Sequence, residues 1–217
     1  NIVNIINSIK SQPSNPDLLI IDDKSPDGTS EEIKKIQKDI SNIFLIERSD
    51  KLGLDTAHKE AYSFAIKNEY EILITMDADF SHDPDEIEKF IQNLEEFSFV
   101  IGSRYIKGGQ CLMKGKRLLL SKYGNLFMKF IFQIDCNEFT TSYRGFNLKK
   151  LNDFHLNLIK TAGYSFFMGT VHEIFRRKFK IKEIPIVFKD REKGYSKIPR
   201  VEIFRTIKNI LFFKFKK

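Results

Sequence analysis

The chain has 217 residues and a net charge of +7, and its length suits one α/β domain with a substantial core. Two cysteines without a CxxC pair, and no histidine pair at ligand spacing, exclude a disulfide scaffold and a zinc site and suit a reducing cytoplasm. The charge gathers in residues 176–217, which hold 15 Lys and Arg against four Asp and Glu. Such a basic end faces nucleic acid, an anionic membrane or a phosphorylated substrate, unless it is only a solvated surface.

Apolar residues at helical spacing predict that the chain opens directly in a helix, over residues 1–10. Short apolar runs then alternate with amphipathic segments, and this strand–helix order favours a parallel, doubly wound sheet. Thr29, with Glu32 three residues later, fits a capping box at the start of the next helix. The expected strands are 18–23, 42–49, 71–79 and 97–105, and the further expected helices are 55–67 and 84–97.

The second half of the chain is less regular. It contains expected helices at 117–132 and 164–178 and a late strand at 181–188. No repeat or low-complexity linker divides the chain, so residues 1–198 are expected to form one domain, followed by a basic amphipathic helix at 199–217. That terminal helix is expected to lie on an anionic membrane, to pack as an ordinary helix, or to lead into membrane-spanning segments.

Five acidic residues crowd the stretch ITMDADFSHDPDEI, and they divide into two groups. Asp83 precedes Pro84, so it is a ready N-cap, and Glu86 completes a capping box. Asp85 lies in the first turn, where the helix dipole favours an anion. These three acidic residues are expected to start a helix, and they need no other function.

Asp77 and Asp79 form the second group, at the carboxyl end of an expected strand, where open α/β sheets bind ligands. Two positions apart on an extended backbone, their carboxylates would point to the same side. Like charges held close are costly unless a cation joins them, and the simplest one is a hard divalent ion whose shell a ligand's phosphates complete. A DxD triplet also arises by chance, so the position at a strand end is what favours a functional interpretation.

Seven motifs occur in order from residue 20 to residue 197: IIDDKSPDGTSEEI, KLGLDTAH, ITMDADFSHDPDEI, VIGSRYIKGG, TTSYRGF, GYSFF and DREKGYSK. Each is weak alone, but the ordered set resembles the family-2 inverting glycosyltransferases, and most of all the dolichyl- and polyprenyl-phosphate mannose synthases. The resemblance implies a GT-A fold, a Rossmann-like and mainly parallel twisted sheet flanked by helices, which here lacks its first strand. It also implies transfer of a hexose, mannose from GDP-mannose, onto a dolichyl or undecaprenyl phosphate with inversion, with Mg²⁺ or Mn²⁺ as cofactor.

The resemblance implies roles for individual residues as well. Asp77 and Asp79 would bind the metal and the diphosphate, with Ala78 beside the ribose, while Ile21 and Asp23 would help to hold the nucleoside. The residues implied around the phosphates are Arg104, Arg117, Arg191 and Lys197, and those implied on the acceptor side are Ser142 and Arg144. Asp79 and the four phosphate-binding cations are the implied catalytic residues, and each cation is otherwise a plain surface charge.

These residue types fit the implied reaction. The phosphate of a polyprenyl phosphate is already an anion, so the reaction needs little or no general base. It needs cations, which bring two phosphorylated substrates together and stabilise the departing diphosphate. Arginine suits this task because a guanidinium can bind a phosphate through two parallel hydrogen bonds.

Several positions depart from the family's pattern and loosen the choice of donor and acceptor. The family usually opens with a strand and a Pro-Thr-Tyr-Asn-Glu-like turn, whereas this chain starts in the helix that would follow. Ser81 stands where a Gln often assists the metal, and Asp55 and Thr141 stand where Gly is common. Gly169 stands where an acidic residue is common.

Other interpretations stay open at this point. One is a family-2 transferase that uses UDP-glucose or another UDP-sugar to build a surface glycan or a lipid-linked sugar. Another is a non-catalytic nucleotide-sugar-binding or scaffold subunit. A nucleic-acid binder is least favoured, because no recognised module appears and the basic residues are mixed with packing residues. Under the leading interpretation the protein is cytoplasmic and peripheral on the cytoplasmic face of a membrane.

Overall fold

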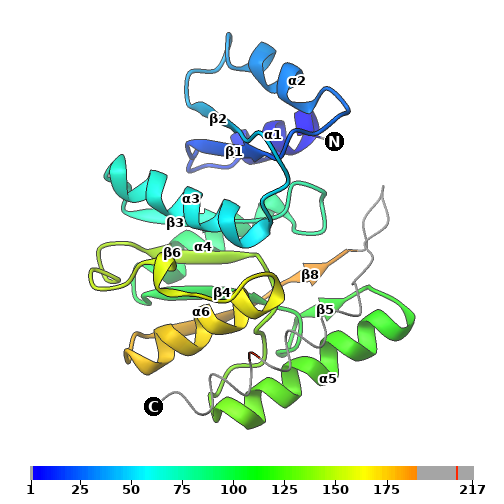
Figure 1. The fold of residues 1–217 in the computed structure, drawn as a ribbon, viewed down its shortest axis with the longest axis vertical. Helices are drawn as coiled ribbons and strands as arrows, with labels where there is room; N and C mark the ends of the chain where they lie inside the picture. Colours follow the sequence, from blue (N-terminus) through cyan, green and yellow to red (C-terminus); the bar gives the residue numbers. More distant parts are fainter. Residues whose placement is uncertain (1, 190–208, 210–217) are drawn as a thin grey trace.

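The computed structural model describes residues 2–189 and residue 209, which form an α/β fold (Figure 1). The helices are α1 (Ile2–Lys10), α2 (Thr29–Ile36), α3 (Leu54–Lys67), α4 (Ile87–Leu94), α5 (Gly115–Phe132) and α6 (Tyr164–Arg176), with short 3-10 helices η1 (Pro84–Glu86) and η2 (Leu156–Leu158). The strands are β1 (Leu18–Asp22), β2 (Ile43–Glu47), β3 (Ile72–Thr75), β4 (Phe99–Ser103), β5 (Gln110–Cys111), β6 (Arg144–Asn147), β7 (Ile181–Pro185) and β8 (Val187–Phe188).

Backbone hydrogen bonds group these strands into three sheets. β1 and β2 pair in parallel, with Leu18 opposite Ile43 and Asp22 opposite Glu47. The central sheet has the order β3-β6-β4-β7, and β5 pairs with β8 in parallel. β4 and β7 are parallel, but β6 runs antiparallel between β3 and β4. The expected α/β architecture is therefore confirmed, and the expected parallel pairing is corrected at β6.

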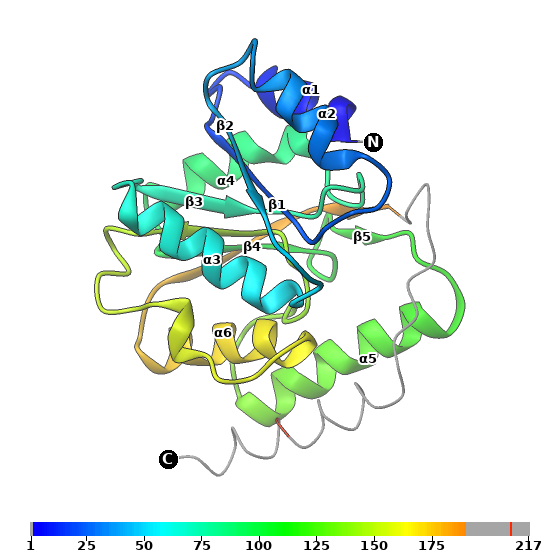
Figure 2. The ribbon, with the colours of Figure 1, turned by 45° about the horizontal axis from the view of Figure 1, so that its top comes forward.

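Side chains alternate between the two faces of the central sheet, as the two-residue period of a strand requires. Phe99 and Ile101 of β4 enter a core that α3 and α6 cover, whereas Val100 between them packs with Phe90 and Leu94 of α4. The β1–β2 sheet is covered in the same way, by α1 and α2 on the side of α4 and by α3 on the other side. Figure 2 shows this layering, with strands between the two groups of helices.

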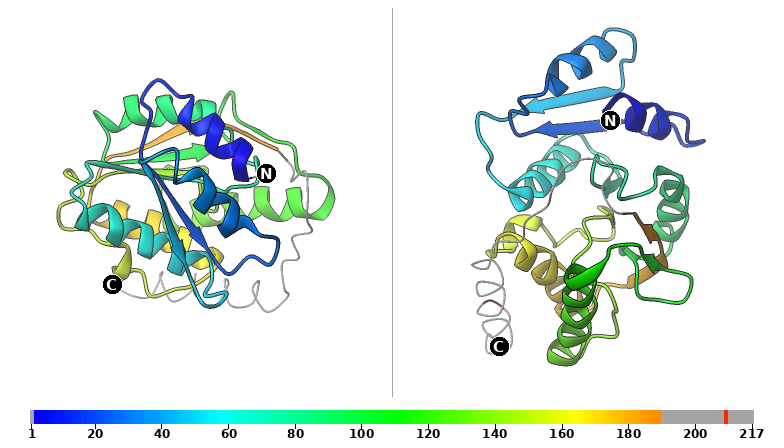
Figure 3. Two further views of the ribbon diagram at one scale, coloured as in Figure 1. Left: turned by 90° about the horizontal axis from the view of Figure 1, so that it is seen from above. Right: turned by 90° about the vertical axis from the view of Figure 1, so that its right-hand side faces the viewer.

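β1 and β3 do not pair with each other, and a cavity of about 830 Å³ lies between them, here called the β1–β3 cavity. Its walls are largely apolar, and its lining includes Ile5, Ile6 and Ile9 of α1 on one side and Ala61 and Phe64 of α3 on the other. The right-hand view of Figure 3 shows the β1–β2 sheet standing apart from the central sheet. Two strand edges with helices over both faces are the surroundings that a further strand would fill. The expectation that the first strand of the fold is missing stays a prediction.

Two helix starts test the expected caps. α2 begins at Thr29 itself, its N-cap is Gly28 with a φ of 79°, and the Thr29 hydroxyl donates to Asp27 Oδ1 at 2.6 Å. The expected capping box is therefore wrong, because an Asp-Gly turn takes the threonine hydroxyl. Asp83 is confirmed as an N-cap, since its Oδ1 accepts a hydrogen bond from the Asp85 N–H at 3.2 Å.

Several element ends also differ from the expectation. The strand expected at 71–79 stops at Thr75, and the strand expected at 181–188 is divided into β7 and β8. β6 was not expected at all. It is short and it needs a glycine, because a Cβ on Gly145 would lie 2.8 Å from Leu94 Cδ1 of α4.

The predictions for the end of the chain lie outside the described residues. These are the terminal helix at 199–217 and the roles of Arg191 and Lys197. In the described part of the chain, no helix is both long and apolar enough to cross a membrane.

Candidate active site

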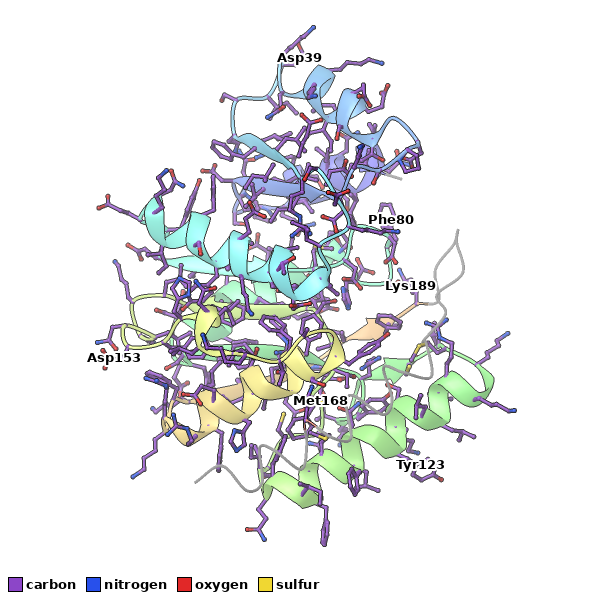
Figure 4. The ribbon with its side chains drawn as sticks, viewed as in Figure 1. Asp39, Phe80, Tyr123, Asp153, Met168 and Lys189 are labelled. Atoms are coloured by element: carbon purple, nitrogen blue, oxygen red, sulfur yellow. The ribbon has the colours of Figure 1, made fainter. Side chains whose placement is uncertain are left out.

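Asp77 and Asp79 lie in the segment that follows β3, rather than on the strand itself. Hydrogen bonds orient their carboxylates, whereas the sequence predicts that an extended strand would do so. Asp77 Oδ1 accepts from Ser142 Oγ at 2.7 Å, and Asp79 Oδ1 accepts from the Ser81 N–H at 3.0 Å. Between Asp79 and Ser81, Phe80 takes a left-handed backbone conformation with a φ of 60°, which turns the chain sharply (Figure 4).

His82 is buried directly behind Asp77. Its Nδ1 accepts from the Asp77 N–H at 3.1 Å, which leaves its proton on Nε2, 3.3 Å from Thr141 Oγ1. Burial lowers the pKa of His82 and outweighs the Asp77 carboxylate, which acts in the opposite direction. The ring also packs against Tyr143 and Phe188. A neutral imidazole therefore holds the backbone at Asp77.

A second cavity, of about 970 Å³, opens at the carboxyl ends of β1 and β2 and is here called the β1–β2 end cavity. This volume is in the range of small-ligand sites. Ile21 and Asp23, which were expected at a nucleoside, both line it. Ala78 lines both cavities, while Asp77 and Asp79 line the β1–β3 cavity. The DxD segment thus lies where the two cavities meet.

An ion pair fixes the wall of the β1–β2 end cavity. Arg48, at the end of β2, donates from Nε to Asp23 Oδ1 at 2.6 Å and is largely buried. The neighbouring Asp22 turns inward instead. Burial alone would raise the pKa of Asp22, but hydrogen bonds from Ser25 and Ser30 outweigh burial and lower it. Asp23 is therefore held in place by a cation that the sequence analysis did not single out.

Arg104, expected at a phosphate, is buried in a bidentate pair with Glu138. Arg104 Nε and Nη2 donate to the two carboxylate oxygens of Glu138, each at 2.7 Å, and Nη2 also donates to Thr140 Oγ1 at 2.7 Å. Glu138 is fully buried and accepts the backbone N–H groups of Thr140 and Thr141 as well. Burial alone would lower the pKa of Arg104, but the Glu138 carboxylate outweighs burial and raises it.

Ser142 and Arg144, expected on the acceptor side, take different positions. Ser142 touches the DxD segment through its hydrogen bond to Asp77. Arg144 lies beneath that segment with 1% of its surface exposed, and it donates to the carbonyl oxygens of Thr141, Phe167 and Phe139 at 2.8–2.9 Å. Burial lowers the pKa of Arg144 to about 9. This residue organises the loop before β6, so any effect on a substrate is indirect.

Of the remaining implied cations, Arg117 is in the first turn of α5 and is partly exposed. Four functional candidates escaped the sequence analysis, namely Arg48, His82, Glu138 and Thr140. Only His82 had a local signal, because it lies five residues after Asp77. The other three depend on contacts between distant segments.

The donor set at the DxD segment fits a hard divalent cation. Two carboxylates that neighbouring hydrogen bonds hold in place are the oxygen ligands that Mg²⁺ and Mn²⁺ prefer. In the part of the chain that the structure describes, no three His, Cys, Asp or Glu residues gather around one point. A metal held by Asp77 and Asp79 would therefore take its other oxygens from a bound ligand and from water.

Comparison with known proteins decides the family. The model of glycosyl transferase family 2 matches residues 1–154. The chain belongs to this family. It is 30% identical to a polyprenol monophosphomannose synthase of Mycolicibacterium smegmatis over 184 residues, which cover 83% of this chain and 69% of that protein. It is also 30% identical to an undecaprenyl-phosphate mannosyltransferase of Micrococcus luteus, over 84% of this chain and 75% of that one. The resemblance drawn from the ordered motifs is thus confirmed.

Solved structures of glycosyltransferases share the GT-A fold of this family 2 chain. A glucosyl-3-phosphoglycerate synthase of Mycobacterium tuberculosis, in complex with Mn²⁺, UDP and phosphoglyceric acid, superposes with a TM-score of 0.67 at 15% identity, over 99% of this chain and 74% of that one. A mannosyltransferase of Pyrobaculum calidifontis, in complex with GDP-mannose and Mn²⁺, gives a TM-score of 0.55 at 16% identity, over 89% and 54% of the two chains. At these identities the likeness supports the fold alone.

Proposed function

We propose that this family 2 glycosyltransferase moves mannose from GDP-mannose onto a polyprenyl phosphate, with inversion at the anomeric carbon and with Mg²⁺ or Mn²⁺ as cofactor. The observation that carries the proposal is the DxD segment beside the β1–β2 end cavity, which Ala78 lines, with each carboxylate oriented by a hydrogen bond. The two relatives at 30% identity support mannose as the sugar and a polyprenyl phosphate as the acceptor.

In this mechanism the nucleoside lies in the β1–β2 end cavity, against Ile21 and the Asp23–Arg48 pair. Asp77 and Asp79 would hold the divalent cation, and a bound cation would supply positive charge that stabilises the departing diphosphate. Ser142 and His82 hold Asp77 in place, so its carboxylate needs little reorientation when the substrate binds.

The acceptor phosphate supplies the nucleophile. One of its oxygens attacks the anomeric carbon as the bond from that carbon to the diphosphate breaks, and the electron pair leaves with the nucleoside diphosphate. No proton has to be removed from the acceptor, so no general base is required. For Arg117, Arg191 and Lys197, positive charge near the reacting phosphates stays a proposal from the sequence. The Arg104 guanidinium is bound to Glu138, so for Arg104 the proposal concerns the Arg104–Glu138 pair and not a free cation.

A transfer assay with several donors tests this proposal. The protein is mixed with undecaprenyl phosphate, Mn²⁺ and radiolabelled GDP-mannose, UDP-glucose or UDP-galactose, and the labelled lipid is extracted. We expect label in the lipid from GDP-mannose and its loss in Asp79→Ala. Label from a UDP-sugar alone would favour the rival donor. Binding of a nucleotide in a thermal-shift assay without transfer from any donor would favour a non-catalytic subunit.

The proposed acceptor implies that the protein works at a membrane surface, peripherally on the cytoplasmic face. The two cysteines are compatible with that compartment, since Cys136 is buried and both are free thiols. Fractionation of cells that express the protein tests the location, and release from membranes by salt would distinguish peripheral binding from insertion.

A further inference from the structure

Asn125 is a buried polar residue on the inner side of α5. Only 2% of its surface is exposed, and its side chain makes three hydrogen bonds. The amide nitrogen donates to the Ser121 carbonyl oxygen at 2.9 Å and to Thr140 Oγ1 at 3.4 Å, and Oδ1 accepts the Phe139 N–H at 2.6 Å. A buried amide is costly unless it is hydrogen-bonded, so packing alone would favour an apolar side chain here. The partner of Asn125 outside its own helix is the stretch of residues 138–142, here called the 138–142 loop.

These contacts fix the orientation of the Asn125 amide. If its oxygen and nitrogen exchanged places, an N–H group would face the Phe139 N–H, and an oxygen would face the Ser121 carbonyl. The side chain therefore holds the backbone of the 138–142 loop at one distance from α5. In Figure 1 and in Figure 2, α5 lies at the edge of the molecule, away from β3. Any effect of Asn125 on the DxD segment that follows β3 must therefore pass through this loop.

The first residues of the 138–142 loop hold Arg104. Glu138 Oε1 accepts both the Thr140 N–H, at 3.0 Å, and Arg104 Nη2, at 2.7 Å, so one carboxylate binds the loop to the guanidinium. The Thr140 hydroxyl, which the Asn125 amide contacts, also accepts a hydrogen bond from Arg104 Nη2 at 2.7 Å. A displacement of the loop would therefore displace the Arg104 guanidinium as well.

The last residues of the 138–142 loop contact the DxD segment at two points. Ser142 Oγ donates to Asp77 Oδ1 at 2.7 Å. Thr141 Oγ1 lies 3.3 Å from His82 Nε2, and His82 Nδ1 accepts the Asp77 N–H. The loop thus supports both the carboxylate and the backbone of Asp77. Hydrogen bonds of this length are lost when the partners separate by about 1 Å, so the position of the loop decides how Asp77 presents its carboxylate.

We propose that Asn125 is a positioning residue for the candidate active site, acting through the 138–142 loop on Asp77 and on Arg104. Asn125 hydrogen-bonds neither of them directly, since its partners are the loop and its own helix. The simpler alternative is that Asn125 only satisfies the Phe139 N–H and stabilises the fold. The two differ in one measurable respect, because only a positioning residue changes the cation affinity of a protein that is still folded. The effect on a cation rests on Asp77 and Asp79 as its ligands, and only an effect on mannose transfer rests on the proposed function.

Mn²⁺ binding tests the proposal with the whole chain. The electron paramagnetic resonance signal of free Mn²⁺ reports its uptake, with and without GDP, at a temperature well below the melting temperature of every variant. The variants are Asn125→Leu, Asn125→Asp, Ser142→Ala and the double variant Asn125→Leu/Ser142→Ala. The control is Asn93→Leu, because the Asn93 amide also donates to the carbonyl oxygen four residues earlier in its helix. If Asn125→Leu does not fold, Asn125→Ala takes its place, with the same expected result.

We expect Asn125→Leu to bind Mn²⁺ at least about tenfold more weakly than wild type, as loss of a group that supports a metal ligand does. Asn125→Asp keeps an oxygen for the Phe139 N–H and should recover most of the affinity, and Asn93→Leu should bind like wild type. Because Asn125 acts through the same loop as Ser142, the double variant should bind within about threefold of Ser142→Ala. Equal Mn²⁺ affinity in Asn125→Leu and wild type, or losses that multiply in the double variant, would overturn the proposal.

The transfer assay separates this inference from the proposed reaction. Mn²⁺ affinities that follow the expected pattern, in a protein that transfers no mannose, would refute the proposed reaction and leave the role of Asn125 standing. Mannose transfer by wild type, together with unchanged Mn²⁺ affinity in Asn125→Leu, would refute the role of Asn125 alone. Wild type that takes up no Mn²⁺, with or without GDP, would overturn both the role of Asn125 and the cation site.

Discussion

Glu138→Ala should be among the most damaging single substitutions near the site. The fully buried carboxylate of Glu138 binds Arg104 through two hydrogen bonds of 2.7 Å, and it also accepts the N–H groups of Thr140 and Thr141 at 3.0 and 3.2 Å. The substitution leaves the Arg104 guanidinium buried beside donors that lack an acceptor. Removing one partner of a buried ion pair costs about 3–5 kcal/mol of unfolding free energy.

Urea unfolding followed by circular dichroism measures this cost, with equal m-values required for a fair comparison. The matched control is Asp135→Ala, which removes a carboxylate three residues away whose side chain is 96% exposed and paired with Lys129. That control should unfold close to wild type. If Glu138→Ala and Asp135→Ala unfold at the same urea concentration, the buried pair is not what stabilises this region.

The Glu138 carboxylate should also make the unfolding free energy depend on pH. Burial alone would raise the pKa of Glu138, but Arg104 outweighs burial and lowers it below the ordinary value. The folded protein therefore favours the ionised form of Glu138. The stability that this ionised carboxylate contributes is complete above its pKa in the unfolded chain, and it is lost as the pH falls through its lower pKa in the folded protein. Glu138→Gln has no carboxyl group to protonate at this position. Its unfolding free energy should therefore fall less than that of wild type between about pH 6 and about pH 3.

Three further predictions concern the DxD segment and the packing above it. Asp83→Ala removes an N-cap, so it should lower the unfolding free energy by about 1 kcal/mol and leave the Mn²⁺ affinity, measured by calorimetry, unchanged. Asp79→Ala should lower the Mn²⁺ affinity and leave stability unchanged, and equal loss of Mn²⁺ binding in both variants would refute the division of the acidic residues. Ser142→Ala should weaken Mn²⁺ binding by about 10–100-fold, as loss of the hydrogen bond to Asp77 implies, whereas the exposed Ser63→Ala should not change it. Gly145→Ala should lower the unfolding free energy by about 1–3 kcal/mol, because the new Cβ would meet Leu94 and Phe90 of α4. The control Gly124→Ala, whose Cβ would meet nothing within 4 Å, should be neutral or stabilising, and similar melting temperatures for the two variants would contradict the packing of α4 on β6.

The sequence was sufficient for elements whose pattern is local. The apolar run before Asp22, the amphipathic repeat of α4 and the Asp83-Pro84 start each depend on neighbours in the chain, and all were found. β6 was missed because it is short and contains a buried arginine, whose charge suggests a surface position. Arg144 is buried there because three carbonyl oxygens accept its hydrogen bonds, two from the loop just before β6 and one from Phe167, 23 residues away. No apolar periodicity encodes these contacts.

The candidate site divides in the same way. Asp77 and Asp79 were found because they follow an apolar run, and their ordered neighbours led to the correct family. Glu138 lies 34 residues from Arg104, and Arg48 lies 25 residues from Asp23, so only the fold brings these pairs together. An extended strand does not orient the two aspartates as expected, because hydrogen bonds from Ser142, in the loop before β6, and from the Ser81 N–H hold their carboxylates.

The central claim is that Asp77 and Asp79 hold the cation that makes mannose transfer to a polyprenyl phosphate possible. The most direct measurement is the initial rate of labelled mannose transfer from GDP-mannose to undecaprenyl phosphate, titrated with Mn²⁺, for wild type, Asp77→Asn, Asp79→Asn and the control Asp85→Asn. We predict a Mn²⁺-dependent rate for wild type and Asp85→Asn, and a rate at least about 100-fold lower for the other two variants at any Mn²⁺ concentration. Transfer by Asp77→Asn and Asp79→Asn at the wild-type rate would contradict the account. So would a wild-type rate that neither added Mn²⁺ nor EDTA changes.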